Sequence, residues 1–129
     1  ALREAVHRLQ DGRVVGIFPE GGIRDGAASM LAGAPPQRGV AMLARLSNAP
    51  VLPCVLLGSD RLYNLKKWKP WRRLPIWIAF GKPLPTGLSE PDFSSAYAAS
   101  LLALRQDLLT HHGATEADLP RSPQTRMKE

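Results

Sequence analysis

Residues 14–26 read VVGIFPEGGIRDG, an apolar run that ends at a proline and continues into a polar segment rich in glycine. The run over 14–18 is short and mostly β-branched, which predicts a buried strand, and Pro19 ends it because proline has no N–H for the ladder. The glycines that follow let the backbone turn and let a ligand approach closely. Glu20 and Arg24 are therefore expected at the exit of a buried strand, where α/β folds place their sites. A guanidinium there suits bidentate capture of a phosphate group.

The segments on either side of this stretch alternate between helical and strand patterns. We expect helices over 1–11, 37–47 and 89–112, and strands over 14–18, 51–57 and 74–81. The apolar run over 51–57 is nearly continuous, which is typical of a strand covered on both faces. The last helix begins at a capping-box variant and places large apolar side chains on one stripe: Phe93, Tyr97, Leu101, Leu104 and Leu108. The alternation predicts an α/β fold, with a mixed sheet of at least three strands flanked by helices.

Size and composition limit the chain to one domain or a part of one. Its 129 residues, 44% of them apolar, can build a modest core. Its apolar runs are far shorter than the roughly 18 residues that a transmembrane helix needs. The one cysteine, Cys54, lies in an apolar run and is expected to pack there, so neither a disulfide nor a metal site is predicted. Residues 113–129 contain few large apolar side chains, which predicts a mobile tail.

Positive charge is concentrated in residues 61–73, which contain no acidic side chain. The rest of the chain is balanced, so this segment supplies the whole net charge of +6. Tryptophans among cations are typical of a membrane interface, where the indole lies among headgroups and the cations attract anionic lipid. The residues expected to contact the membrane are Lys66, Lys67, Trp68, Lys69, Trp71, Arg72 and Arg73. Two other interpretations are a solvated loop whose tryptophans pack on the core and a nucleic-acid groove with stacked bases.

Four features follow one another along the chain in a fixed order. Residues 18–21, Phe-Pro-Glu-Gly, are followed by an arginine at position 24 and by an arginine–glycine helix start over 38–44. A strand framed by prolines then occupies 49–56, and a strand that ends in Phe-Gly-Lys-Pro occupies 76–84. In this order the features resemble the motifs of the glycerophospholipid acyltransferase family, over about residues 1–85. Arg24 stands one residue later than the arginine in the commonest form of the motif, Phe-Pro-Glu-Gly-Thr-Arg-Ser.

The resemblance implies transfer of a fatty acyl group from a thioester, acyl-CoA or acyl carrier protein, to a hydroxyl of a lysophospholipid or glycerol phosphate. It implies an acceptor site at Glu20, Gly21, Gly22 and Arg24, in which Arg24 holds the phosphate and Glu20 orients Arg24 or contacts a hydroxyl. A loop ion pair between Glu20 and Arg24 is the simpler structural alternative. The resemblance further implies a peripheral protein on the cytoplasmic face of an anionic membrane, with no separate cofactor and no nucleic-acid partner.

The family's catalytic motif, His-x-x-x-x-Asp, has no counterpart in this sequence. Five positions after His7 stands Gly12, and five positions after His111 stands Glu116, in the predicted tail. Residues 1–112 are therefore expected to be the C-terminal part of a glycerolphosphate-acyltransferase-like domain that is incomplete on its N-terminal side, with no catalytic residue. A non-catalytic relative that binds lipid or phosphate is the main alternative, and a basic nucleic-acid-binding module is the weaker one.

Overall fold

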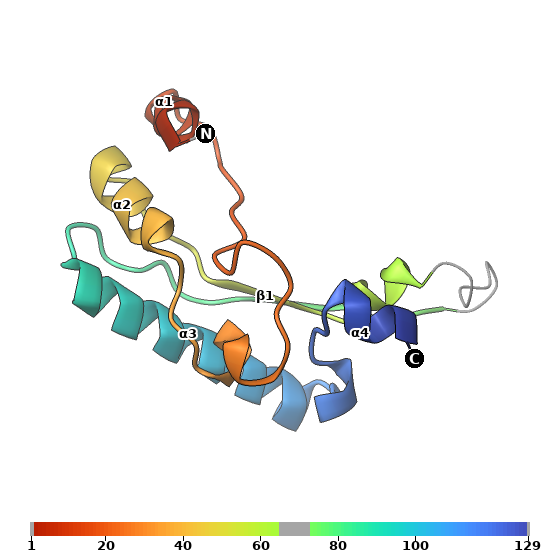
Figure 1. Ribbon diagram of the computed structural model, residues 1–129. Helices are drawn as coiled ribbons and strands as arrows, with labels where there is room; N and C mark the ends of the chain where they lie inside the picture. The colour runs from red at the N-terminus through yellow and green to blue at the C-terminus, as the bar shows by residue number, and fades with distance from the viewer. Residues whose placement is uncertain (1, 65–72, 129) are drawn as a thin grey trace.

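The computed structural model describes residues 2–64 and 73–128, which form a mixed α/β fold (Figure 1). The α-helices in this part of the chain are α1 (Leu2–Gln10), α2 (Arg38–Ser47), α3 (Glu90–His111) and α4 (Pro123–Lys128). The strands are β1 (Cys54–Leu57) and β2 (Trp77–Phe80), and the short 3₁₀ turns are η1 (Gly26–Ala28), η2 (Met30–Ala32), η3 (Ser59–Tyr63) and η4 (Glu116–Asp118). No helix among the described residues combines the length and apolar character needed to cross a bilayer.

The sheet has two antiparallel strands in the described part of the chain, fewer than the mixed sheet of at least three strands that was expected. Cys54 pairs with Phe80 and Leu57 with Trp77, and a bridge between Val51 and Leu84 extends the pairing. Side chains alternate along β1, so the prediction of a strand covered on both faces is wrong. Val55 and Leu57 point into the core, whereas Cys54, Leu56, Ile78 and Phe80 are exposed on the other face. Cys54 therefore does not pack in the interior.

The predicted strand over 14–18 is also wrong. Residues 13–18 run from α1 to the glycine-rich loop without regular structure (Figure 1). The side chain of Val14 is 98% exposed and that of Phe18 is 80% exposed. A strand forms only where a neighbour completes its ladder, and β1 and β2 pair with each other here. An apolar run indicates a tendency toward burial, but its partner is decided by contacts that are distant in the sequence.

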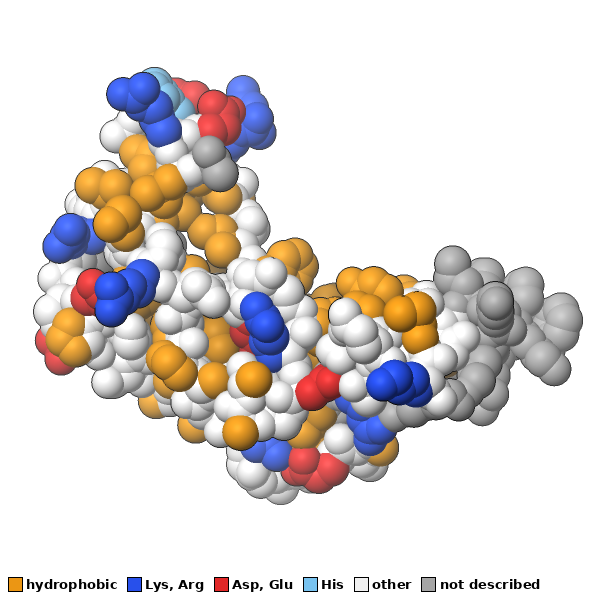
Figure 2. All heavy atoms as spheres, viewed as in Figure 1, with side chains coloured by type: hydrophobic (Ala, Val, Ile, Leu, Met, Phe, Trp, Pro, Cys, Tyr) orange, Lys and Arg blue, Asp and Glu red, His pale blue; other side chains and the backbone are white. Residues whose placement is uncertain are grey.

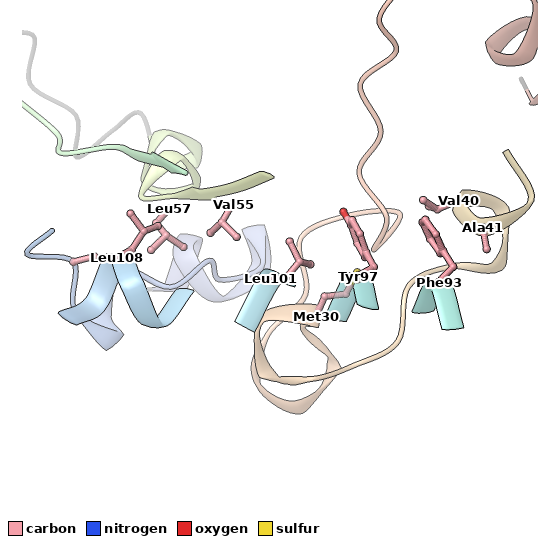
Figure 3. Close-up of a cluster of buried hydrophobic side chains, with 10 residues drawn as sticks. Met30, Val40, Ala41, Val55, Leu57, Phe93, Tyr97, Leu101 and Leu108 are labelled. Carbon is pink, nitrogen blue, oxygen red and sulfur yellow. The ribbon is translucent and has the colours of Figure 1, made fainter. Parts of the chain in front are cut away.

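Helix α3 contributes four of the ten residues in the buried core cluster of the described chain, all from the apolar stripe that the sequence predicts. Ser89 caps the helix by accepting a hydrogen bond from the Asp92 backbone N–H at 3.3 Å, which confirms the expected helix start. The stripe faces β1, β2 and η2, and its members Phe93, Tyr97, Leu101 and Leu108 are buried while Leu104 is partly buried (Figure 3). The rings of Phe93 and Tyr97 stack with centroids 5.7 Å apart. Helix α2 packs against both α1 and α3.

Residues 113–128, for which the sequence predicts mobility, fold back on the body of the protein. They form η4 and α4, and Ala114 joins the core beside Leu108. Few apolar side chains take part in this packing. Ion pairs and hydrogen bonds to residues far away in the sequence hold the segment in place. The pattern of apolar residues does not predict such contacts.

Candidate functional site

The glycine-rich loop, residues 19–37, is closed at its base. The backbone N–H of Gln37 donates to the Pro19 carbonyl at 2.9 Å, so the two ends of the loop lie side by side. A tight turn follows Phe18, whose carbonyl accepts from the Gly21 N–H at 3.0 Å. Gly21 has φ +67°, in the left-handed region that glycine adopts without strain. The glycine at this position is thus required by the backbone, and a Cβ there would meet no atom within 4 Å.

Glu20 ties the beginning of the loop to its middle. Its Oε1 accepts hydrogen bonds from the Ser29 hydroxyl at 3.1 Å and from the Met30 backbone N–H. Ser29 and Met30 are both buried, and the Ser29 hydroxyl also accepts from the Leu31 N–H at 3.2 Å. Glu20 therefore places a carboxylate at the start of η2, where unpaired N–H groups favour an anion. Burial, and secondarily nearby Cys54 and Glu20, raise the pKa of Tyr97 beneath the loop, so its phenol is neutral.

Arg24 lies on the exposed side of the same loop. It lines a surface pocket of ≈ 210 Å³ together with Glu20, Ala28, Met30, Pro35 and Gln37. Within the described ranges no acidic side chain lies within 4 Å of the Arg24 guanidinium, so the loop ion pair with Glu20 does not form. Of the four residues expected at the acceptor site, the structure brings Glu20 and Arg24 to one pocket. Gly21 and Gly22 are exposed neighbours that do not line it.

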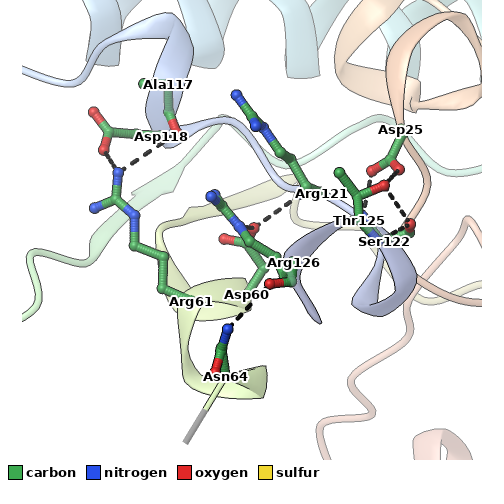
Figure 4. Close-up of polar contacts among 10 residues, drawn as sticks. All are labelled: Asp25, Asp60, Arg61, Asn64, Ala117, Asp118, Arg121, Ser122, Thr125 and Arg126. Carbon is green, nitrogen blue, oxygen red and sulfur yellow. Dashed lines mark hydrogen bonds and ion pairs between the residues drawn. The ribbon is translucent and has the colours of Figure 1, made fainter. Parts of the chain in front are cut away.

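Asp25, the residue after Arg24, connects the loop to the C-terminal segment (residues 115–128). Its Oδ1 accepts from the Ser122 backbone N–H and its Oδ2 accepts from the Thr125 hydroxyl at 2.6 Å (Figure 4). Hydrogen bonds from Thr125 and Ser122 favour the ionised form and lower the pKa of Asp25 below its ordinary value. No local pattern predicts this contact, because Ser122 and Thr125 lie 97 and 100 positions after Asp25.

Other ionic contacts fix the C-terminal segment to the body of the protein. Asp60, only 1% exposed, accepts from the Arg126 Nε at 2.6 Å and from the Arg121 backbone N–H at 2.9 Å. Arg61 pairs with Asp118 (Figure 4). Asp60 and Arg61 lie in η3, which follows Gly58. Gly58 has φ +87°, and an added Cβ there would clash with the Pro75 carbonyl oxygen, so this position requires glycine.

The loop is also tied to helix α3 through Arg105. This guanidinium donates to the Leu31 carbonyl at 3.1 Å and to both Glu116 oxygens, at 2.8 and 3.0 Å. Glu116 is therefore engaged by Arg105, and it is Asp107 that contacts His111, at 3.0 Å. His111 and Glu116 do not form the acid–base pair that their spacing in the sequence allows.

The expected membrane-contact residues fall mostly outside the described residues: Lys66, Lys67, Trp68, Lys69, Trp71 and Arg72. Arg73 is described and exposed. Arg61 belongs to the same charged stretch of the sequence, but its charge is paired internally with Asp118. Figure 2 shows the face that carries exposed hydrophobic side chains alongside scattered cations, with no single basic patch among the side chains drawn in colour.

Residues 1–57 match the model of the family described as Acyltransferase. The matched range includes the loop start with Glu20 and Arg24, the helix α2 and the strand β1, whereas the Phe-Gly-Lys-Pro feature lies beyond it. No curated protein and no solved structure matches the chain.

Proposed function

We propose that this chain, whose residues 1–57 match the model of the family described as Acyltransferase, binds the phosphate of a lysophospholipid or glycerol-phosphate acceptor through Arg24. The observation that carries the proposal is an exposed guanidinium that has no acidic partner among residues 2–64 and 73–128, on a loop that is bonded on both sides of Arg24. An unpaired cation on an ordered loop favours an anion, because no internal ion pair has to break and little chain entropy is lost on binding.

The reaction assigned to this site is acyl transfer from a thioester, acyl-CoA or acyl carrier protein, to the acceptor hydroxyl. The hydroxyl oxygen attacks the thioester carbonyl, its proton passes to a base, and the thiolate leaves. Holding the phosphate aims the hydroxyl, which is a contribution of positioning rather than of proton transfer. Family enzymes use the histidine of His-x-x-x-x-Asp as that base, and the sequence of residues 1–129 contains no such motif.

Glu20 has a supporting role in this proposal. Its Oε1 already accepts from Ser29 and Met30, so it maintains the shape of the pocket that Arg24 lines. This favours a loop-organising glutamate over one that contacts the acceptor hydroxyl or orients Arg24.

The test is a titration with glycerol 3-phosphate at low ionic strength, followed by NMR chemical shifts. Replacing Arg24 by alanine is expected to weaken binding by about 10- to 100-fold, the range for loss of a charge-assisted contact of roughly 1.5–3 kcal/mol. Arg45→Ala is the matched control, because Arg45 is an exposed arginine on α2 outside the pocket. Equal affinities of the parent and Arg24→Ala would refute the proposal.

An activity assay separates the enzyme from a relative that only binds. The 129-residue chain is expected to bind glycerol 3-phosphate but to show no acyl transfer from a long-chain acyl-CoA to lysophosphatidic acid, because it lacks the catalytic motif. Turnover well above a heat-inactivated control would show that a base within these residues suffices.

We further propose that the protein docks peripherally on the cytoplasmic face of an anionic membrane. Support comes from the sequence of residues 66–73, where cations alternate with Trp68 and Trp71 and no acidic residue intervenes. The internal pairing of Arg61 removes that arginine from the proposed membrane contact.

A further inference from the structure

We propose that Asp25 is a positioning residue, which holds Arg24 at the phosphate pocket by fastening the loop to the C-terminal segment. The inference rests on the proposed role of Arg24 and adds a determinant of affinity that lies outside the matched family range, at Ser122 and Thr125.

The first observation is where the Asp25 side chain goes. Asp25 stands at the N-cap position of η1, where an aspartate ordinarily accepts hydrogen bonds from the N–H groups of its own turn. It makes no such side-chain cap here. Both carboxylate oxygens instead accept hydrogen bonds from the C-terminal segment, Oδ1 from the Ser122 N–H and Oδ2 from the Thr125 hydroxyl. The contact is therefore a tie between distant segments rather than a local turn.

The second observation is that the partner segment is itself anchored. Thr115 and Asp118 form a reciprocal capping box, in which Asp118 Oδ2 accepts from the Thr115 N–H and hydroxyl, each at 2.8 Å. Asp118 also pairs with Arg61, and the nearly buried Arg126–Asp60 pair holds α4 against η3. The hydrogen bonds from this segment to Asp25 therefore connect the loop, through α4 and η3, to the end of β1.

The third observation concerns the charges on either side of Arg24. Glu20 precedes it and Asp25 follows it, and both carboxylates are engaged elsewhere in the protein. One side of the loop is fixed through Glu20 and the other through Asp25. If Asp25 loses its partners, Arg24 is fixed from one side only. The free energy of anion binding then includes the conformational entropy that Arg24 loses when it becomes ordered.

The test removes the Thr125 hydroxyl and leaves Arg24 and Asp25 unchanged. Thr125→Val is expected to weaken glycerol 3-phosphate binding about three- to tenfold, the scale of one lost hydrogen bond. Thr125→Ser keeps the hydroxyl and is expected to restore affinity. Thr110→Val is the matched control, because Thr110 is exposed on α3 and its hydroxyl accepts a side-chain hydrogen bond from Gln106, on the same helix.

A double-mutant cycle distinguishes positioning from general destabilisation. In an Arg24→Ala background Thr125→Val is expected to have no further effect on affinity, because there is no Arg24 left to position. The same loss in both backgrounds, or parent affinity for Thr125→Val, would overturn the inference while leaving the role of Arg24 intact. If Thr125→Val does not fold by circular dichroism, Asp25→Asn replaces it and must show the same dependence on Arg24. An Arg24→Ala variant that binds as the parent does would refute the proposed function itself.

Discussion

Arg24 and Arg61 show that the role of an arginine depends on whether an acidic side chain pairs with it. Both lie in segments that the sequence marks as functional, one by a glycine-rich motif and the other by clustered charge. Arg24 remains exposed beside a pocket, whereas Arg61 pairs with Asp118 and helps to hold the C-terminal segment. Charge patterning shows where cations are numerous, but the acids that neutralise them can come from any distance along the chain.

Substitution of Glu20 separates a structural role from direct contact with substrate. Glu20→Ala leaves the buried Met30 N–H without its acceptor and is expected to lower the free energy of unfolding by about 1–3 kcal/mol. Urea denaturation measures this change. Glu20→Gln retains a side-chain oxygen acceptor and is expected to keep most of the stability and phosphate affinity. If Glu20→Gln were as stable as the parent but lost phosphate binding, the carboxylate charge would act on the ligand directly.

At the scale of elements, helices were predicted more accurately than strands. The expected helices over 1–11, 37–47 and 89–112 correspond closely to α1, α2 and α3, because caps and the periodicity of apolar side chains are local signals. The strand over 14–18 does not form, and β1 and β2 are shorter than expected, because pairing depends on a partner distant in sequence. The sequence singles out Glu20 and Arg24, which line one pocket, but the hydrogen bonds to Ser29, Thr125 and Ser122 have no local signature in the sequence.

Adjacent leucines in β1 test the one-sided burial of the sheet. Leu57 is 0% exposed and Leu56 is 36% exposed. Leu57→Ala is expected to lower the free energy of unfolding by about 2–5 kcal/mol, because it leaves a cavity in the core. Leu56→Ala is expected to cost less than about 1 kcal/mol, since its side chain faces outward. Similar losses for both variants, measured by urea denaturation, would indicate a strand covered on both faces.

The C-terminal segment is expected to loosen in acid. The hydrogen bonds from Thr125 and Ser122 lower the pKa of Asp25. Burial opposes ionisation of Asp118, but hydrogen bonds from Thr115 and the charge of Arg61 outweigh it and also lower the pKa. A carboxyl whose pKa is lower in the folded state stabilises the fold fully above its unfolded pKa, about 4 for aspartate, and loses this contribution as the pH falls through the folded value.

The measurement is thermal unfolding between pH 7 and pH 2, comparing the parent with Asp25→Asn and Asp118→Asn. The parent is expected to lose stability below about pH 4, and each variant to lose less over the same range because one titrating group is gone. Asp107→Asn serves as the control, since Asp107 is exposed and contacts only histidine side chains among the described ion pairs. Parallel pH profiles for the parent and both variants would contradict the role of Asp25 and Asp118 in the acid destabilisation.

At the scale of the whole molecule, the proposed membrane contact depends on charge that is concentrated in one segment. Replacing Lys66, Lys67, Lys69, Arg72 and Arg73 by glutamine is expected to abolish most co-sedimentation with vesicles that contain phosphatidylglycerol and to change little with neutral lipid. The reason is that each cation near an anionic surface contributes about 1 kcal/mol. Trp68→Ala and Trp71→Ala are expected to weaken binding to both kinds of vesicle, because indole insertion does not require lipid charge.

The control for this experiment changes the net charge equally at other positions. It replaces five cations of α1, α2 and the segment between them by glutamine: Arg3, Arg8, Arg13, Arg38 and Arg45. If this variant still binds the vesicles while the 66–73 variant does not, the membrane contact lies in residues 66–73. Equal loss in both would show that total charge, rather than this segment, attracts the protein to the membrane.

The tie between Asp25 and Thr125 also sets an order of events during translation. The two residues are 100 positions apart, so Asp25 leaves the ribosome well before its partner is made. At about 5–20 residues per second the loop waits roughly 5–20 s before Thr125 is added. Helices α1 and α2 can form from local contacts in that interval, but the glycine-rich loop cannot yet bond to Thr125. A nascent chain therefore carries Arg24 long before it carries both anchors of the loop on which the proposed phosphate contact depends.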